Sequence, residues 1–227
     1  MLPKKSVVPG IVTAGHSSVA VRMPAHALFR RLLKRAGVPL AAPSANPFGY
    51  VSPTTAEHVR QSLGTKIRHI LDGGAAKIGL ESTIVDLRDP ARPRLLRPGA
   101  ITRGELERVL GRTVERVHRT ADGAAQLAPG MLARHYSPRT PVVLHAEMPR
   151  RQAGDEAWVF VARPLHPRGR NIFWLDPRGD LRGAARRLFA LLRELDRGGF
   201  AKIHVERPRP GGLAEAINDR LERAAAR

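Results

Sequence analysis

The clearest hydrophobic pattern lies in the last third of the chain. Between Leu181 and Leu195, apolar residues fall at 181, 184, 188, 191, 192 and 195, which is the spacing of one buried face of an α-helix. Apolar runs at 141–145, 157–162, 171–175 and 201–206 predict strands, and residues 212–226 predict a closing helix. This alternation indicates a small Rossmann-like α/β unit, although the glycine fingerprint of a dinucleotide site is absent from the sequence.

Two further helices are predicted in the first half. Residues 26–37 have helical apolar spacing, and Gly37 is a typical helix end. The stretch "TRGELERVLG" (102–111) places Thr102 and Glu105 at the spacing of a capping box and closes on a glycine. Because each segment has a start or stop signal as well as periodicity, both helices are expected.

A third helix and five strands complete the first half. The helix is expected from about residue 53 to Gly64, beginning either with a capping box of Thr54 and Glu57 or with Ser52 as the cap before Pro53. The predicted strands are 18–22, 38–43, 67–74, 82–87 and 94–99. The first half is therefore predicted to be an open mixed sheet with helices, in the α/β class.

The periodicity fails between about residues 118 and 141. Glycine, proline and small residues dominate there, which indicates a linker, although "GMLARHY" (130–136) is unusually rich for a spacer. We therefore predict a first domain at 1–117, a linker at 118–141 and a C-terminal Rossmann-like domain at 142–227.

Composition limits the class of protein. The 227 residues are 42% hydrophobic and 26% charged, which is typical of a folded globular chain. No apolar run approaches the length of a membrane span, and the start "MLPKKSVVPG" has no signal-peptide core, so a cytoplasmic protein without membrane contact is expected. The absence of cysteine excludes disulfides, thiolate metal sites and a cysteine nucleophile.

The net charge of +19 allows two interpretations. Its 39 Lys and Arg residues could form a surface for a polyanion such as RNA. The other interpretation is an arginine-rich composition without a functional patch, which the scatter of the basic residues and the 4% aromatic content favour. Nucleic-acid binding is kept as a second hypothesis.

Small hydroxylated segments follow several predicted strands. They place Ser44, Ser52, Ser82 and Arg97 at strand ends or at a helix start, where ligands bind in α/β folds. Hydroxyls and free backbone N–H groups favour phosphate, and an arginine supplies a bidentate charged partner. Asn46 is expected instead to fix its own loop through side-chain to backbone hydrogen bonds. Without a phosphate-binding loop of the P-loop type or a zinc spacing of histidines, these residues predict a phosphorylated or nucleotide ligand and no protein-bound metal.

Five motifs in order carry a sharper signal. They are "VAVRMPAH", "PLAAPSANPFGYVSPTTAEHV", "LDGG" with "GLESTIVDL", "LLRPGAITRGELE" and "PGMLARHYSPRTPV". Over residues 1 to about 143 this series resembles the L-threonylcarbamoyl-AMP synthases, two-domain enzymes built on a YrdC-like domain, and "GLAEAINDRLERAA" resembles the end of their C-terminal domain. The resemblance implies a nucleotidyltransferase that forms threonylcarbamoyl-AMP and pyrophosphate from L-threonine, bicarbonate and ATP. The product serves threonylcarbamoyladenosine modification beside the anticodon of tRNA, so tRNA is expected as an indirect partner, through downstream transfer enzymes.

The same resemblance implies roles for individual residues. Those that match ATP-binding positions are Ser18, Ser44, Ser52, Arg97 and Tyr136, the last closing over the nucleotide. Those that match threonine-binding positions are Arg22, which faces the carboxylate, Ala42, through its backbone, and Ser82. No side chain is assigned to covalent catalysis, because the reaction needs positioning and charge stabilisation rather than a nucleophile. Mg²⁺ is expected to arrive on the nucleotide.

One part of the family pattern has no counterpart here. A strand motif resembling "PTETVYGL" and a basic K-x-R motif that grips the triphosphate are both missing from the 227 residues. The first domain is therefore expected to be an N-terminally truncated YrdC-like domain, and the chain as written to be inactive. Under the second hypothesis, the chain is a non-catalytic nucleotide- or RNA-binding remnant.

Overall fold

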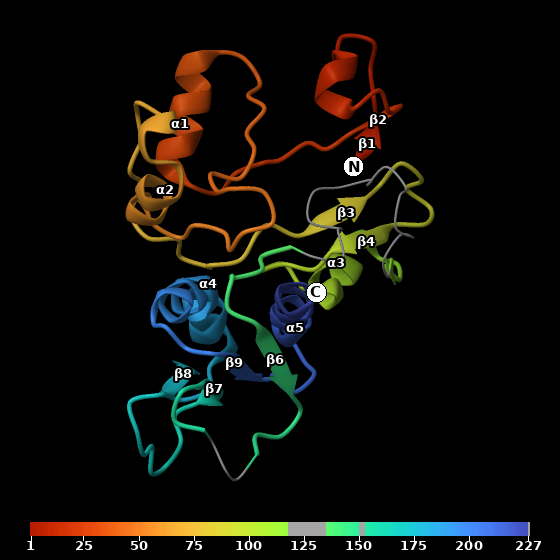
Figure 1. Cartoon of the computed structure of the whole chain (residues 1–227). Helices are drawn as coiled ribbons and strands as arrows, with labels where there is room; N and C mark the ends of the chain where they lie inside the picture. The colour runs from red at the N-terminus through yellow and green to blue at the C-terminus, as the bar shows by residue number, and fades with distance from the viewer. Residues whose placement is uncertain (118–134, 150–152, 227) are drawn as a thin grey trace.

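The computed structural model of the chain describes residues 1–117, 135–149 and 153–226. In Figure 1 the first part of the chain forms the upper half of the molecule and the C-terminal part the lower half. No helix within the described ranges is long and apolar enough to cross a membrane. The proposed limits of the first domain, linker and C-terminal domain stay a prediction, and residues 118–134 of the linker lie outside the described residues.

The C-terminal part is a parallel four-stranded sheet in the order β6-β9-β7-β8, with each neighbouring pair parallel. Its strands are β6 (Val142–His145), β7 (Ala157–Ala162), β8 (Ile172–Asp176) and β9 (Ile203–Glu206). Its helices are α4 (Leu181–Arg197) and α5 (Ala214–Ala225). In Figure 1 both helices lie between the sheet and the first part of the chain. The predicted Rossmann-like unit is confirmed element by element.

The core of the C-terminal part follows the predicted helical face. Leu188, Leu191 and Leu195 of α4 are buried in one cluster with Ile217 of α5 and Ile203 of β9. Burying each such side chain contributes roughly 1.5–3 kcal/mol. The same cluster includes Val51 and Tyr136, so the core continues into the first part of the chain.

The first part contains two small sheets and three helices. Strands β1 (Leu2–Pro3) and β2 (Ser18–Val19) pair antiparallel. Strand β4 (Arg94–Arg97) lies between antiparallel β3 (Ile84–Asp86) and parallel β5 (Glu115–Arg116). The helices are α1 (Ala27–Ala36), α2 (Ala56–Leu63) and α3 (Arg103–Leu110), and short 3-10 turns lie at Gly10–Thr13 and Gly64–Lys66. A mixed sheet is present as expected, but it has three strands, and the strand predicted at 18–22 is reduced to β2 in the separate two-stranded sheet.

The predicted ends of two helices are confirmed. Helix α1 ends on Gly37, which adopts the left-handed conformation at φ +67°. Helix α3 begins with the predicted capping box, in which the Thr102 amide donates to Glu105 at 2.7 Å and the Glu105 amide donates to the Thr102 hydroxyl at 3.3 Å. The sequence was sufficient to predict these helix ends because each bond joins residues about one helical turn apart.

Helix α2 is capped differently from the prediction. Thr55 is its N-cap, and its hydroxyl accepts a hydrogen bond from the His58 amide at 3.1 Å. Neither the capping box of Thr54 and Glu57 nor a cap by Ser52 forms, so both versions of that prediction are wrong. Ser52 is thereby left to make a contact far along the chain.

Two predicted strands do not form. Residues 38–43 and 67–74 are extended or irregular, and within the described residues no strand pairs with either. Val38 is 57% exposed and Leu71 is 59% exposed, so neither segment is the buried strand that its apolar composition indicates. A strand needs a hydrogen-bonding neighbour as well as apolar residues, and these two segments have none among the described strands.

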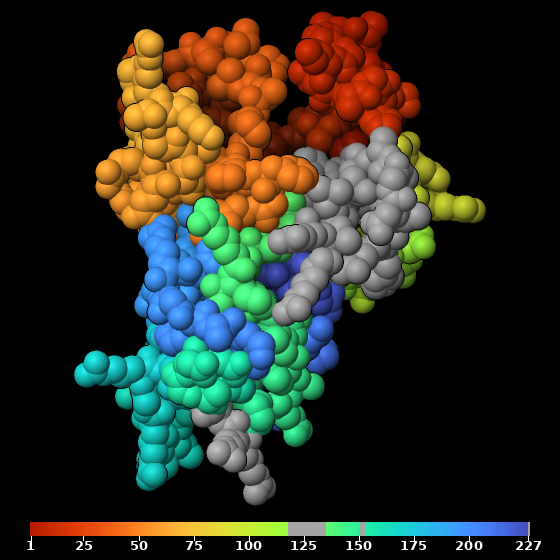
Figure 2. Space-filling view, viewed as in Figure 1, coloured from red at the N-terminus to blue at the C-terminus, as the bar shows by residue number. Residues whose placement is uncertain are grey.

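The two parts of the chain are in direct contact. Figure 2 shows the orange surface of the first part resting on the blue and green surface of the C-terminal part. The hydroxyl of Tyr50 donates to the Asp196 carboxylate of α4 at 2.8 Å. A side chain on Gly79 would come within 2.6 Å of the α4 backbone at Ala185 and Arg186. The loops of the first part therefore pack closely against α4.

Candidate functional site

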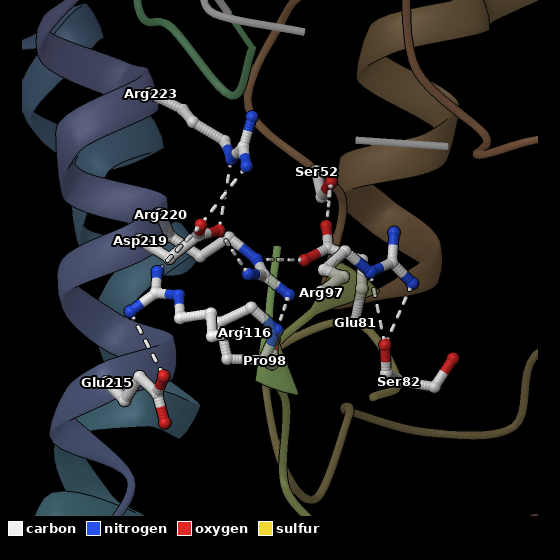
Figure 3. Close-up of polar contacts among 10 residues, drawn as sticks. All are labelled: Ser52, Glu81, Ser82, Arg97, Pro98, Arg116, Glu215, Asp219, Arg220 and Arg223. Atoms are coloured by element: carbon white, nitrogen blue, oxygen red, sulfur yellow. Dashed lines mark hydrogen bonds and ion pairs between the residues drawn. The ribbon is translucent and has the colours of Figure 1, made fainter. Parts of the chain in front are cut away.

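A chain of polar contacts starts at Ser52 and ends in helix α5 (Figure 3). The Ser52 hydroxyl donates to Oε1 of Glu81 at 2.6 Å, and Oε2 of Glu81 accepts from Nε of Arg220 at 2.8 Å. Arg220 is 0% exposed and also donates to the Pro98 carbonyl at 3.0 Å and to the Asp219 carboxylate at 2.7 Å. One buried guanidinium thus joins three segments of the chain.

Arg97 binds the backbone of Ser82, the residue after Glu81. Its Nε and Nη2 atoms donate to the carbonyl oxygen of Ser82 at 3.1 and 3.0 Å. The Arg97 side chain is buried, whereas Ser82 is exposed. Arg97 therefore fixes the backbone of Ser82 through a forked pair of bonds, and Figure 3 shows this pair beside the Ser52–Glu81 contact.

The loop of residues 81–83 rests directly on Gly99. A Cβ atom added to Gly99 would lie 2.4 Å from the Thr83 amide nitrogen and 2.8 Å from the Glu81 carbonyl oxygen. The Thr83 hydroxyl in turn donates to the Ile101 carbonyl at 2.8 Å. Glycine at position 99 is thus a requirement of close backbone packing.

Tyr136 is enclosed beside the same group of side chains. It is 1% exposed, adopts φ +61°, and lies 5.4 Å under the Arg220 guanidinium and 5.3 Å from the Phe189 ring. Its buried hydroxyl makes no hydrogen bond to any described residue. A left-handed backbone is uncommon for a bulky residue, and a buried hydroxyl without a partner costs about 1–3 kcal/mol. Both features indicate a site where a ligand could complete the hydrogen bonding.

Arg22 is a second guanidinium near Arg97. Burial lowers the pKa of Arg97, and the positive charges of Arg220 and Arg22 add to that lowering. Arg22 is exposed, and within the described part of the chain it makes no hydrogen bond or ion pair. It is therefore available to a carboxylate or phosphate from solution.

The remaining predicted site residues lie apart from this polar group. Ser18 is buried in β2 beside Pro3. Ala42 lies in the exposed stretch 38–43 that was expected to be a strand, and Ser44 follows that stretch. The Ser44 hydroxyl makes no hydrogen bond to the described residues. The structure therefore brings together Ser52, Ser82, Arg97 and Tyr136. The roles of Ser18, Arg22, Ala42 and Ser44 stay a prediction.

Asn46 fixes its own loop as predicted. Its side-chain amide donates to the carbonyls of Pro47 at 2.9 Å and of Tyr50 at 3.0 Å. These local bonds tie down the segment that leads to Ser52.

Apart from Arg97, the charged residues that surround Ser52, Ser82 and Tyr136 were not predicted from the sequence. Four arginines and three carboxylates form the network drawn in Figure 3: Arg97, Arg116, Arg220, Arg223, Glu81, Glu215 and Asp219. A signal was available for Arg220, because it falls four residues after Ala216 and four before Ala224 on the buried face of α5. A charged residue on the apolar face of a helix indicates a buried polar partner.

The ionisation of the network follows from its geometry. Burial by itself would raise the pKa of Glu81, but the Arg220 guanidinium and the Ser52 hydroxyl outweigh it and hold that pKa below its usual value. Asp219 behaves alike, since Arg223 and Arg220 outweigh the effect of burial and lower its pKa. Both groups are therefore carboxylates at neutral pH.

These lowered pKa values predict a pH-dependent stability. A carboxyl whose pKa is lower in the folded state contributes fully above its unfolded pKa, about 4.3 for Glu, and loses that contribution as the pH falls. We expect the free energy of unfolding of the wild type to exceed that of Glu81→Gln at pH 7, and the difference to shrink below about pH 4.3. Urea unfolding at several pH values measures it. Glu222→Gln, which removes a half-exposed carboxylate from α5, is the control, and a Glu81→Gln difference that stays constant with pH would contradict the ion pair.

Comparison with known proteins adds the family. A family model described as "Telomere recombination" matches residues 1–99, and one described as "Threonylcarbamoyl-AMP synthase, C-terminal domain" matches residues 101–226. The chain is 38% identical to the threonylcarbamoyl-AMP synthase of Pyrococcus abyssi, over 99% of this chain and 69% of the relative. It is 36% identical to that of Bacillus subtilis, over 94% of this chain and 65% of the relative, and 35% identical to that of Schizosaccharomyces pombe, over 96% and 60%. The chain thus spans about two thirds of the length of these relatives.

Solved structures agree with these relatives. A crystal structure of Pyrococcus abyssi Sua5 complexed with L-threonine matches with a TM-score of 0.85 and 36% identity, over 99% of this chain and 68% of that one. A variant of the same protein, in which an adjacent histidine and tyrosine are replaced by alanine, matches with a TM-score of 0.82 and 34% identity, over 99% and 67%. The fold, the site motifs and the sequence identity agree, and the chain belongs to the threonylcarbamoyl-AMP synthase family.

Proposed function

We propose that this chain carries the L-threonine and ATP sites of a nucleotidyltransferase that forms threonylcarbamoyl-AMP and pyrophosphate. The observation that carries the proposal is the joining of Ser52, Ser82, Arg97 and Tyr136 around one buried polar network, at positions where the family motifs require ligand contacts. The relative solved with L-threonine covers nearly the whole chain at a TM-score of 0.85, which supports the same site.

Threonine and nucleotide are proposed to use different groups. Arg22 offers its exposed guanidinium to the threonine carboxylate, with Ser82 and the backbone of Ala42 beside the amino acid. Ser18, Ser44, Ser52 and Arg97 contact ATP. The buried Tyr136 hydroxyl, without a partner among the described residues, is available to the nucleotide. His135 and Tyr136 are adjacent in this sequence, as are the histidine and tyrosine replaced in the Pyrococcus abyssi variant.

The chemistry requires positioning rather than a covalent nucleophile. The amine of threonine condenses with bicarbonate to a carbamate, with loss of one water. A carbamate oxygen then attacks the α-phosphorus of ATP, and the bond from that phosphorus to pyrophosphate breaks. Arg97, the arginine proposed to contact ATP, stabilises the charge that develops on the phosphoryl oxygens. Among the described residues no group of three or more His, Asp or Glu could hold a metal ion. We therefore propose that Mg²⁺ enters bound to the nucleotide.

A second candidate function is a nucleotide- or RNA-binding remnant without catalysis. The net charge of +19 supports it, as does the absence of the basic triphosphate motif from the sequence. The two functions differ in their salt dependence. Binding of RNA through phosphates would weaken steeply as salt rises, whereas L-threonine binding would persist. Filter binding of tRNA at two salt concentrations separates them.

A reaction assay tests whether the 227 residues are sufficient for turnover. The chain is mixed with L-threonine, bicarbonate and Mg-ATP, pyrophosphate is measured, and the adenylate product is identified by mass spectrometry, with the Pyrococcus abyssi synthase as control. Because the triphosphate motif is not among the 227 residues, we expect substrate binding without measurable turnover. Pyrophosphate release at a rate comparable to the control would show that the triphosphate is held within these residues.

A further inference from the structure

Two arginines of the C-terminal part are buried in its contact with the first part. Arg193 of α4 is 1% exposed and Arg220 of α5 is 0% exposed. A buried guanidinium is stabilising only where its donors are paired. The partners of these two arginines therefore identify what each helix holds.

Arg193 holds the loop that ends at Ser52. Its Nη2 donates to the Val51 carbonyl at 2.6 Å, its Nε to the Ser52 carbonyl at 3.3 Å, and its Nη1 to the Ser62 hydroxyl at 3.0 Å. The guanidinium also lies 4.9 Å over the ring of Tyr50. Helix α4 thus fixes the backbone of Ser52 from below.

Arg220 holds the side chain of Ser52 and the loop of Ser82. It pairs with Glu81, whose other oxygen receives the Ser52 hydroxyl, and it binds the carbonyl of Pro98 next to Arg97. Arg97 in turn binds the Ser82 carbonyl. The Ser52 and Ser82 loops are therefore both held by arginine side chains. Two of these arginines, Arg193 and Arg220, belong to the C-terminal part.

We propose that Arg193 and Arg220 are positioning residues, through which the C-terminal part sets the geometry of the Ser52 and Ser82 loops. The proposal rests on the proposed function and assigns a role to the C-terminal part: it acts as a fixed support of the substrate site. Neither arginine touches substrate. Arg220 acts through Glu81, and Arg193 acts through the main chain of residues 51 and 52.

The test is a double-mutant cycle read out by ligand affinity. The dissociation constants of ATP and of L-threonine are measured by calorimetry on the 227-residue chain, for Arg220→Met, Glu81→Gln and the pair of substitutions combined. We expect each single variant to bind ATP about ten- to hundred-fold more weakly, which is the change in affinity that the loss of one hydrogen bond to a charged ligand produces. The double variant is expected to be no weaker than the singles, because residues that act through one path are not additive.

Two further variants complete the design. Arg193→Met is expected to weaken ATP binding more than L-threonine binding, because Arg193 contacts the Ser52 loop and not the Ser82 loop. Arg207→Met is the matched control: it removes a half-exposed arginine that pairs with Glu222 inside the C-terminal part, and its affinities should equal those of the wild type. Circular dichroism and the melting temperature establish that each variant is folded at the temperature of the titration.

The outcomes are distinct. Folded Arg220→Met that binds both ligands as the wild type does would overturn the positioning role, and so would a double variant whose loss equals the sum of the single losses. Should Arg220→Met not fold, Glu81→Gln, which keeps the Arg220 bonds to Pro98 and Asp219, decides in its place: unchanged ATP affinity overturns the inference, and weakened affinity supports it. A wild type that binds neither ligand would overturn the proposed function itself.

Discussion

Arg22→Ala is expected to weaken L-threonine binding by about ten- to hundred-fold while leaving ATP binding unchanged, because a charged hydrogen bond contributes about 1.5–3 kcal/mol and about 1.4 kcal/mol is a factor of ten. Arg22 is exposed and makes no bond to the described residues, so removing it should not disturb the fold. Calorimetric titration of each substrate measures the split.

A matched arginine gives the control for this experiment. Arg30 of α1 is also exposed, and its side chain makes no hydrogen bond to the described residues. Arg30→Ala removes the same charge from the chain without a proposed role, so both affinities should stay at the wild-type values. Equal weakening of L-threonine and ATP by Arg22→Ala would mean that Arg22 supports the structure instead of binding the carboxylate.

Gly99→Ala is expected to lower the free energy of unfolding by about 1–3 kcal/mol, the usual cost of overpacking. The added methyl would meet the Thr83 nitrogen at 2.4 Å and the Glu81 carbonyl at 2.8 Å, and backbone atoms cannot rotate away as a flexible side chain does. The loop that carries Ser82 has to move, so substrate affinity should fall together with stability. Urea unfolding and L-threonine titration of the same sample measure both effects.

Gly104 provides the corresponding control. It lies inside helix α3, and a Cβ atom there would meet nothing within 4 Å. Gly104→Ala should therefore stabilise the chain by up to about 1 kcal/mol through helix propensity and leave substrate affinity unchanged. If Gly99→Ala lowered neither the free energy of unfolding nor the substrate affinity, residues 81–83 would not be closely packed on Gly99.

The sequence predicted the elements whose signals are local. Helix α4 followed from its apolar spacing, and helix α3 from a capping box that joins Thr102 to Glu105. The C-terminal strands were identified correctly because each is an apolar run bounded by turn residues. The strands predicted at 38–43 and 67–74 failed because strand formation depends on a distant partner, which the residues themselves do not reveal.

The site was also predicted only in part, because its contacts join residues that are far apart in the sequence. The family motifs identified Ser52, Ser82 and Arg97, which the structure joins in one network. Ser52 was also one of the two caps considered for helix α2, a contact within one turn, whereas its hydroxyl donates to Glu81, 29 residues away. The contact of Glu81 with Arg220 spans 139 residues. Neither pair can be predicted from local spacing, and the second joins the C-terminal part to the first.

The most direct test of the account is a titration of L-threonine into the 227-residue chain, with and without ATP. The account predicts saturable binding of L-threonine that Arg22→Ala weakens selectively and that Gly99→Ala weakens along with stability. The Pyrococcus abyssi protein, which has been solved with L-threonine bound, sets the concentration range. Absence of L-threonine binding by the folded chain, at concentrations that saturate the Pyrococcus abyssi protein, would contradict the assignment of the threonine site to these residues.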